Sequence, residues 1–282
     1  MNKIEKFSVD DVRFPTSKDL TGSDAVHIDP DYSATYVTVY TSDEHLKGYG
    51  IAFTIGKGND IVADCIKHFF PMFVGMTIDE LENEIGNLWY KCVDHSQLRW
   101  LGPEKGVVHM AVAAIFNSFW DLIAKRHKKP LWQFVVESDP ETIMKWLTFK
   151  NIEDVLTKDE AYNILKGSQK YKHDRMRTLL KEGYPSYTTA AGWLGYSDEK
   201  IVSLCKKYIS MGWKHFKVKV GLDLDADIKR LKLIRETVGN DCFIMVDANQ
   251  QWSVEQSIKH INAYKKFNLL FVEEPTSPDD VL

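Results

Sequence analysis

FKVKV at residues 216–220 opens a pattern that decides the fold of this chain, and MVDAN at 245–249 and VEEP at 272–275 repeat it. Each string lies at the exit of a strand-like run, and helix-length segments separate the three. Side chains two residues apart on a β-strand share a face, so Lys217 and Lys219 are expected to point the same way. Strands that alternate with helices are typical of a parallel (β/α) barrel, whose catalytic groups lie at the carboxyl ends of the strands.

The polar residues at these strand ends are expected to meet in one space. Strand alternation puts Asp247 and Asn249 on the same face, and it puts Glu273 on the face opposite Val272 and Glu274. The resulting set of two ammonium groups, one amide and two carboxylates suits removal of a proton next to a carboxylate, because the enediolate product carries two negative charges. Asp247 and Glu273 are the hard oxygen ligands that Mg²⁺ prefers. Asn249 is placed to hydrogen-bond the metal shell or the substrate.

The two lysines are expected to lower each other's pKa. Their stems lie roughly 6 to 7 Å apart, because a strand rises about 3.3 Å per residue. At an effective dielectric constant of ~20 their repulsion is roughly 2.5 to 3 kcal/mol. This repulsion predicts that the ordinary lysine pKa of about 10.4 falls toward the range in which a lysine acts as a base.

Each of these motifs has a simpler structural explanation when it is taken alone. Lys-x-Lys and Glu-Glu-Pro are common strings, so the lysines would be solvated strand residues and the acids ordinary loop residues. The recurrence of polar groups at successive strand ends favours the active-site interpretation over coincidence.

The three motifs resemble those of the enolase superfamily, and within it the mandelate-racemase-like acid-sugar dehydratases. The phrases at 216–221, 245–250 and 272–278 are most similar to the L-fuconate dehydratase group, which includes the mitochondrial enolase superfamily proteins. The resemblance implies an α/β fold with an α+β N-terminal capping domain. It also implies the first half, about four β/α units, of an enolase-type modified TIM barrel.

The resemblance assigns a role to each polar residue of the strand ends. It makes Lys219 the base that exchanges the α-proton and Lys217 the neighbour that contacts the substrate carboxylate. Asp247 and Glu273 become two of three ligands of Mg²⁺, the implied cofactor. The third carboxylate and a His acid are expected on later strands, so the chain is interpreted as truncated after Leu282 and is expected to lack normal dehydratase turnover.

A polar loop near the N-terminus is the second candidate for substrate contact. It resembles the family's capping-domain loop, which implies that four of its residues contact the sugar hydroxyls: Gly22, Ser23, Asp24 and Tyr32. A loop of about 17 residues without regular structure is uncommon, and this by itself also suggests a function. The alternative is a plain surface loop with proline turns.

The function implied by the resemblance is dehydration of L-fuconate to 2-keto-3-deoxy-L-fuconate by Mg²⁺-assisted α-proton abstraction and loss of water. Another sugar-acid dehydratase or a racemase would use the same half-site. A catalytically inactive, truncated form with a regulatory or interaction role is the alternative from another class.

Composition bounds the partners of the chain. A formal net charge of −4 over 282 residues gives no broad basic field, so nucleic acid is not expected as a partner. No run is expected to span a membrane. The four cysteines are widely spaced and are expected to be reduced. A small sugar acid is the expected partner, and a homo-oligomer is possible. The acidic N-terminus is unlike a typical transit peptide, so the predicted location is cytoplasmic or mitochondrial.

The chain is predicted to form two domains, a capping domain at 1–140 and a helical connector with a truncated barrel at 141–282. Alternating apolar residues predict a three-stranded meander in the first domain. Its strands are expected at Lys3–Phe14, Thr35–Thr41 and Gly48–Thr54. Capping residues and apolar periodicity predict the barrel elements. The predicted barrel strands are Ser186–Ala190, Lys214–Val220, Phe243–Ala248 and Leu269–Glu273, and the helices between them are Ser197–Ser210, Asp225–Val238 and Ser253–Lys266.

Overall fold

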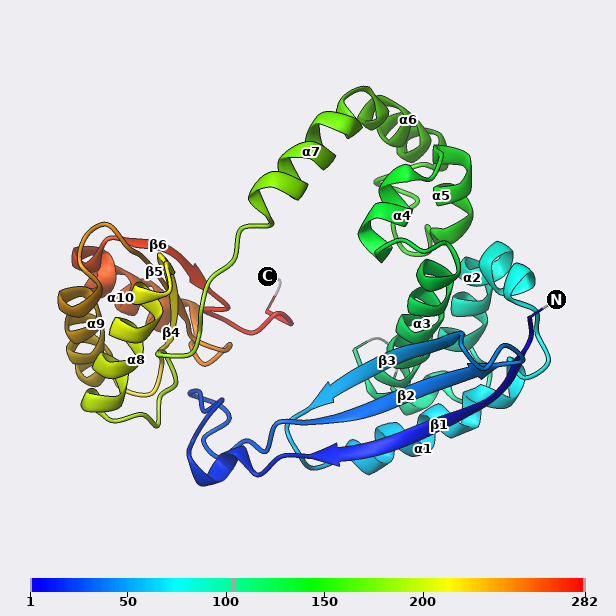
Figure 1. The fold of residues 1–282 in the computed structure, drawn as a ribbon. Coiled ribbons are helices and arrows are strands. Elements are labelled where there is room, and N and C mark those ends of the chain that lie inside the picture. The colour runs from blue at the N-terminus through cyan, green and yellow to red at the C-terminus, as the bar shows by residue number, and fades with distance from the viewer. Residues whose placement is uncertain (1, 103–104, 281–282) are drawn as a thin grey trace. The chain divides into compact units, whose positions relative to one another are not determined.

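The computed structural model describes residues 2–102 and 105–280, and its elements fall into two compact units (Figure 1). Unit 1 contains the residues up to Phe14 together with Ser33–Gly183. Unit 2 contains Pro15–Tyr32 together with the residues from Tyr184 onward. This division differs from the predicted domain boundary after residue 140. The helices up to Gly183 pack with unit 1, and the loop Pro15–Tyr32 leaves unit 1 to pack with the barrel elements.

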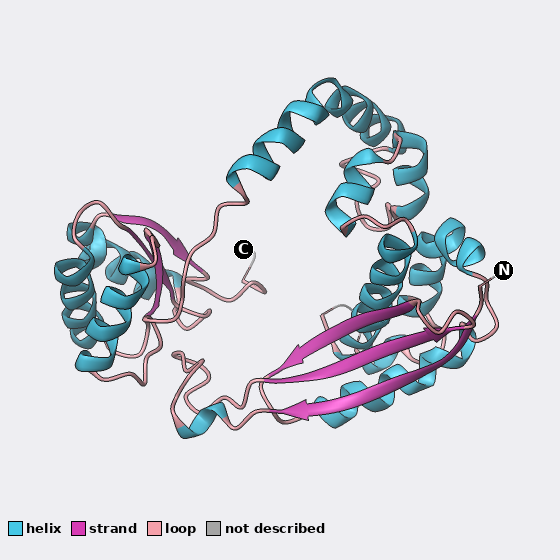
Figure 2. Ribbon diagram, in the orientation of Figure 1, coloured by secondary structure: helices cyan, strands magenta, loops and turns pink. Residues whose placement is uncertain are grey.

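Unit 1 is built on an antiparallel meander, as predicted from the alternating pattern (Figure 2). The strands are β1 (Ile4–Arg13), β2 (Ser33–Thr41) and β3 (Lys47–Thr54), in the order β1-β2-β3. Val37 and Val39 on β2 are buried, whereas Tyr36 is exposed and Thr38 is only partly buried. One face of the sheet therefore lies in the core.

Helices cover that face of the meander, with α1 on β1 and β2 and α3 on β2 and β3 (Figure 1). The helices of unit 1 are α1 (Asn59–Phe69), α2 (Ile78–Val93), α3 (Val107–Arg126), α4 (Leu131–Glu137), α5 (Pro140–Trp146), α6 (Lys158–Ser168) and α7 (Lys172–Glu182). Capping boxes start two of them, at Thr77 with Glu80 and at Thr157 with Glu160.

Helix α3 is the central core helix of unit 1. By length and composition it is apolar enough to cross a membrane, which the sequence reading did not anticipate. Yet 61% of its most apolar window is buried inside the protein. Phe116, Phe119 and Leu122 pack in one apolar cluster with residues from the sheet and from α1 and α2. This burial is the signature of a helix whose apolar surface is satisfied by its own fold.

Unit 2 alternates parallel strands and helices. Its elements are α8 (Asp198–Ser210), β4 (His215–Lys219), α9 (Leu224–Val238), β5 (Phe243–Asp247), α10 (Val254–Tyr264) and β6 (Leu269–Glu273). The sheet order is β4-β5-β6, and both pairings are parallel. The three helices lie on one side of this sheet (Figure 1). Short 3₁₀ helices occur at Thr16–Lys18, Phe70–Met72, Arg99–Leu101, Gln169–Tyr171 and Lys265–Phe267.

The predicted strand Ser186–Ala190 is wrong as a regular strand. In the described residues it forms one isolated parallel bridge, between Thr188 and Phe216. The backbone still follows β4, because Thr188 O accepts from Lys217 N at 2.9 Å and Gly192 O accepts from Lys219 N at 2.9 Å. A turn between these two contacts, with Gly192 N donating to Thr189 O, breaks the ladder.

Apolar residues of the strands and helices form the core of unit 2. Phe216, Val218, Ile244 and Val246 face the helices and are at most 1% exposed. The alternation along β4 and β5 therefore leaves the polar side chains of these strands on the opposite face of the sheet.

All four cysteines are free and buried, in agreement with the predicted reduced state.

Candidate active site at the strand ends

The predicted lysines lie together on the sheet face away from the helices. Lys217 is 7% exposed and Lys219 is 8% exposed, and both belong to β4. Lys219 pairs in register with Asp247, the last residue of β5, which pairs with Glu273, the last residue of β6. Parallel pairing thus brings residues that are 28 and 56 positions from a lysine to one edge of the sheet.

The side chains of these residues converge in one polar cluster. Lys219 Nζ lies 2.7 Å from Asp247 Oδ2 and donates to Asn249 Oδ1 at 2.8 Å. Lys217 Nζ lies 2.9 Å and 2.8 Å from the two carboxylate oxygens of Glu273. It also lies 3.2 Å from Asp247 Oδ2. The structure therefore brings together the five residues that the strand-end motifs predicted.

The two carboxylates of the cluster already converge on one cation, the ammonium group of Lys217. Asp247 and Glu273 both approach its Nζ within 3.2 Å. Hard carboxylate oxygens that meet at a single positive charge fit a small divalent cation such as Mg²⁺. In the described residues, no group of three or more His, Cys, Asp and Glu side chains is arranged to hold a metal. The structure thus offers two carboxylates for such an ion.

The electrostatics of Lys217 differ from the sequence expectation. Burial lowers the pKa of its ammonium group, but hydrogen bonds to Glu273, Tyr187 and Asp247 outweigh burial, and the pKa lies above its ordinary value. The predicted lowering by the second lysine is therefore wrong for Lys217 in this structure. Opposite charges at hydrogen-bond distance stabilise the ammonium form more than a like charge farther away destabilises it.

Asp247 shows the opposite balance. Burial raises the pKa of its carboxyl group, but the hydrogen bond and charge of Lys219 lower it, and the net pKa lies below its ordinary value. The backbone N–H of Asn249 also donates to Asp247 Oδ1 at 3.0 Å. Asp247 is therefore held as a carboxylate, the form that binds cations.

Unusual backbone geometry follows the strands at this edge. Asn249, Gln250 and Glu274 all have positive φ angles, of 48°, 66° and 45°. Left-handed conformations of residues with side chains are uncommon and gather at functional sites. Gln250 N donates to Glu274 O at 2.7 Å, so the two turns hold each other. The turn after β5 is what directs the Asn249 amide back toward Lys219.

The predicted substrate loop lies against the segment that precedes α8. Leu194 N donates to Ser23 O at 3.1 Å, and Gly195 N donates to Ser23 Oγ at 2.9 Å. Thr21 Oγ1 and Tyr196 OH are 2.7 Å apart. These bonds explain why Pro15–Tyr32 belongs to unit 2.

The polar groups of the loop are already engaged within the protein. Ser23 Oγ donates to Leu20 O at 2.7 Å in addition to accepting from Gly195, and Ser23 is 2% exposed. Asp24 Oδ1 accepts from His27 N at 2.7 Å, and His27 Nδ1 lies 3.0 Å from Asp24 Oδ2. In this structure Ser23 therefore holds the loop in place with its hydroxyl group.

Tyr32 connects the loop electrostatically to the cluster. Burial raises the pKa of its phenol, and the negative charges of Asp24 and Asp247 raise it further, whereas Lys217 lowers it. Its ring lies over Gly22, where an added Cβ would come within 2.5 Å of the ring. The structure thus places all four predicted loop residues in the unit that contains the lysines.

Two aromatic residues of the site, Tyr187 and Trp193, were not predicted from the sequence. The Lys217 ammonium lies 4.8 Å from the ring centroid of Tyr187, and the Lys219 ammonium lies 5.7 Å from that of Trp193. Trp193 also meets Tyr32 edge to face, with ring centroids 6.1 Å apart. For Trp193 the available signal was its position just after the predicted first barrel strand, since catalytic groups gather at such exits, whereas Tyr187 lies within that predicted strand.

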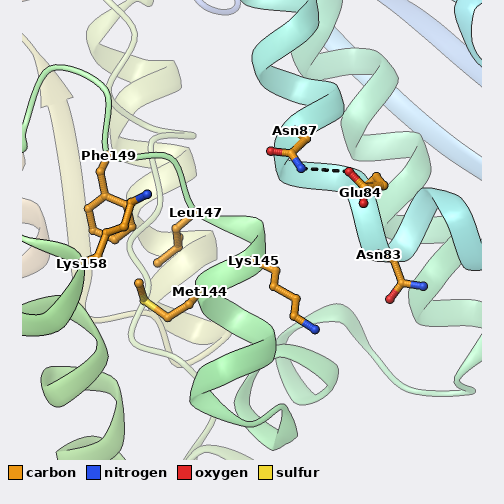
Figure 3. A pocket seen from close by; sticks show the side chains of 8 residues that line it. All are labelled: Asn83, Glu84, Asn87, Met144, Lys145, Leu147, Phe149 and Lys158. Carbon is orange, nitrogen blue, oxygen red and sulfur yellow. Dashed lines mark hydrogen bonds between the residues drawn. The ribbon is translucent and has the colours of Figure 1, made fainter.

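A cavity of about 600 Å³ in unit 1 is distinct from this site (Figure 3). Figure 3 shows its mostly polar lining and a hydrogen bond between Asn87 and Glu84. The lining residues are Asn83, Glu84, Asn87, Met144, Lys145, Leu147, Phe149 and Lys158. None of the predicted site residues contributes to it.

Comparisons with known proteins agree with the fold. Residues 25–135 match the mandelate racemase/muconate lactonizing enzyme N-terminal domain, and residues 200–282 match the enolase C-terminal domain-like family. Mitochondrial enolase superfamily member 1 of Xenopus laevis is 45% identical over 99% of this chain and 63% of its own length. L-galactonate dehydratase of Hypocrea jecorina is 43% identical over 99% of this chain and 62% of its own length.

Solved structures give the same result. Human mitochondrial enolase superfamily member 1 superposes with a TM-score of 0.95 at 43% identity, over 99% of this chain and 64% of that one. A racemase from Streptomyces coelicolor with bound magnesium superposes with a TM-score of 0.73 at 25% identity, over 99% of this chain and 64% of that one. The chain therefore spans somewhat less than two thirds of the relatives that it matches.

The antiparallel meander of unit 1 and the parallel β/α elements of unit 2 fit the N-terminal and C-terminal domains that these family models describe. The chain belongs to the enolase superfamily, with domains of the mandelate racemase and muconate lactonizing type.

Proposed function

We propose that this chain is part of a Mg²⁺-dependent dehydratase of sugar acids, in which Lys219 is the base that removes the α-proton. The observation that carries the proposal is the convergence of Lys217, Lys219, Asp247, Asn249 and Glu273 at one edge of the sheet. A base, a second cation and two metal-binding carboxylates within hydrogen-bond distance of one another suit enediolate chemistry.

Lys219 Nζ takes the proton from C2, and the electron pair of the broken C–H bond moves into the substrate carboxylate. Lys217 contacts that carboxylate and balances its growing negative charge. Asp247 and Glu273 would hold Mg²⁺, which would supply further positive charge beside the substrate carboxylate. Loss of the 3-hydroxyl group as water takes up one proton, which the His acid implied by the resemblance would donate, and tautomerisation then gives the 2-keto-3-deoxy acid.

The ion pairs of the cluster support a change of partners on loading. Asp247 is shared by both lysines, at 2.7 Å and 3.2 Å. If Asp247 and Glu273 held the metal, the lysines would lose these carboxylates as partners. Lys219 can then act as a base, because only the neutral amine accepts a proton.

The loop residues are proposed to contact the sugar chain. Asp24 and Tyr32 lie within electrostatic reach of each other, and Tyr32 is also within reach of Asp247 and Lys217. Gly22 and Ser23 form the turn that carries Asp24 toward this space. Ser23 contributes by holding the loop, because its hydroxyl group bonds Leu20 and Gly195. Asn249 is proposed to bind either the substrate or the metal shell.

L-fuconate is the proposed substrate, with 2-keto-3-deoxy-L-fuconate as the product. The support is the 43% identity to an L-galactonate dehydratase. L-fuconate is the 6-deoxy derivative of L-galactonate, so the two acids have the same configuration at every carbon where the reaction occurs. A substrate of this configuration is the common feature, and the group at C6 distinguishes the two.

The experiment measures formation of the 2-keto-3-deoxy acid from L-fuconate and from L-galactonate, with Mg²⁺ and with a chelator. In a form of the protein that carries the third carboxylate and the His acid implied by the resemblance, we expect Mg²⁺-dependent product, and a loss of about 10³-fold or more in Lys219→Met. Lys214→Met is the matched control, because Lys214 lies just before β4, at the end away from the cluster. This control should retain the activity.

Three results would overturn parts of the proposal. Equal turnover by Lys219→Met would remove Lys219 as the base. Exchange of the C2 proton for deuterium without product would favour a racemase. The absence of both turnover and exchange would favour a regulatory or interaction role.

Location and assembly stay predictions. The relatives named mitochondrial support a mitochondrial location, and a cytoplasmic one is the alternative. A homo-oligomer without nucleic acid or membrane partners is proposed, and size-exclusion chromatography with light scattering would measure the oligomeric state.

A further inference from the structure

Arg230 on α9 binds the backbone of the segment that holds the substrate loop. Its Nη1 donates to Trp193 O at 2.9 Å, and its Nη2 donates to Leu194 O at 2.6 Å. The side chain is partly buried. A guanidinium group offers a planar fork of donors that matches two neighbouring carbonyl groups, which a lysine cannot do with one nitrogen.

The same short segment bonds the substrate loop through its N–H groups. Leu194 N and Gly195 N donate to the carbonyl and hydroxyl oxygens of Ser23. The carbonyl groups of residues 193–194 thus bond Arg230, while the N–H groups of residues 194–195 bond Ser23. Any shift of this segment would move the loop residues Gly22–Asp24 with it.

Trp193 connects the segment to the proposed base. Its ring centroid lies 5.7 Å from Lys219 Nζ and 6.1 Å from the ring centroid of Tyr32. The Trp193 carbonyl group is one of the two that Arg230 holds. The position of the Trp193 ring beside Lys219 therefore depends on the same two hydrogen bonds from Arg230 as the position of the loop does.

We propose that Arg230 is a positioning residue that sets the distance between the substrate loop and the lysine cluster, and thereby the affinity for the polyhydroxyl chain of the sugar acid. This proposal rests on the proposed function. Arg230 acts through residues 193–195 and Ser23. Its loss is expected to weaken substrate binding more than it slows proton abstraction.

Arg235 provides a matched control on the same helix. It also binds backbone carbonyl groups, at 2.7 Å to Cys242 O and 2.9 Å to Phe267 O. Cys242 precedes β5 and Phe267 precedes β6, so these bonds lie at the amino ends of the strands. Arg235 is likewise partly buried, but its bonds are at the end of the sheet away from the lysine cluster.

The experiment compares Arg230→Met with Arg235→Met by steady-state kinetics and by amide hydrogen exchange. Arg230→Met should raise KM for the sugar acid roughly tenfold while kcat changes less than about threefold. It should also speed exchange at the amides of Leu194 and Gly195 and in residues 22–27. Arg235→Met should leave KM and these amides unchanged, even though both variants lower the melting temperature.

Arg230→Lys keeps the charge and one donor, so it should show a smaller change of the same kind. This variant also decides the case if Arg230→Met does not fold. Equal KM changes in the Arg230 and Arg235 variants, or unchanged exchange in residues 22–27 and 194–195, would overturn the proposal. If the unmodified protein turns over no sugar acid, the proposed function fails, but the exchange comparison still tests the role of Arg230.

Discussion

Asn59 in unit 1 and Asp247 in unit 2 are both deeply buried polar residues, 0% and 2% exposed, yet they have opposite kinds of partners. Asn59 Oδ1 accepts from Thr35 and Thr54, and its Nδ2 donates to Asp11 and to Ala34 O. Its amide therefore uses its whole hydrogen-bonding capacity within the fold.

Asp247 instead belongs to a set of charges whose partners overlap. Two lysines share one of its oxygens, and Lys217 is divided between Asp247 and Glu273. A metal or a substrate carboxylate can replace any one of these contacts without leaving a buried charge alone. Burial by itself therefore does not indicate a candidate functional site. Buried charges whose partners can be exchanged, as at Asp247, do indicate such a site.

The largest expected effect separates the two acids of the Glu-Glu-Pro motif. Glu273→Gln should lower Mg²⁺ affinity at least about 100-fold, because loss of a direct ligand costs no less than loss of an outer-shell partner. Glu274→Gln is the control, because Glu274 bonds Gln250 rather than a lysine. Isothermal titration with Mg²⁺ measures both. Equal losses in the two variants would contradict the assignment of Glu273.

A smaller effect is expected at Asn59, and only on stability. Asn59→Ala should lower the free energy of unfolding by about 2 to 3 kcal/mol, because Thr35, Thr54 and the Ala34 carbonyl group lose a buried partner. Exposed Asn87 gives the control, and Asn87→Ala should change it by less than about 0.5 kcal/mol. Urea unfolding gives both values. A change in Mg²⁺ affinity in Asn59→Ala would break the distinction between the two clusters.

The smallest expected effect is a difference in the sign of the pH dependence. Hydrogen bonds from Arg13 and Asn59 lower the pKa of Asp11 in unit 1. Burial raises the pKa of Asp227 in unit 2 despite hydrogen bonds from Gly221 N and Tyr264 OH. A lowered pKa in the folded state adds stability above the ordinary value and loses it as the pH falls through the lowered one. A raised pKa removes stability as the pH rises from the ordinary value to the raised one.

Asp11→Asn and Asp227→Asn test these signs by urea unfolding across the acid range. The stabilising contribution of Asp11 should disappear as the pH falls below its ordinary pKa of 3.8. The contribution of Asp227 should instead become more favourable as the pH falls from neutral toward 3.8. Parallel pH profiles for the two differences from the unmodified protein would contradict the assignment.

Much of the fold followed from local pattern. The alternation around Val37 and Val39 predicted the meander, and β6 was predicted at its observed bounds, Leu269–Glu273. Helices α6 and α10 begin with capping boxes at Thr157 and Ser253. A capping box depends only on residues three positions apart, so the local sequence is enough to predict it. Ser186–Ala190 had an equally plausible strand pattern, but pairing with β4 decides whether a strand forms, and a turn interrupts that pairing.

The site was predictable where it depended on strand periodicity. Lys217, Lys219, Asp247 and Glu273 share an edge because side chains alternate and parallel strands align their carboxyl ends. The pKa of Lys217 was not predictable in this way, because spacing along one strand gives the distance to the other lysine and not to the carboxylates of neighbouring strands.

Sequence alone determined the residues that we propose for proton abstraction and metal binding, together with the strands that carry them, because periodicity and capping act over a few neighbouring positions. Only the tertiary structure decided which charges pair, that Ser23 is bonded to Gly195, and that Arg230 holds Trp193. These contacts join residues 172 and 37 positions apart, and their distances depend on how strands, loops and helices pack rather than on any local pattern.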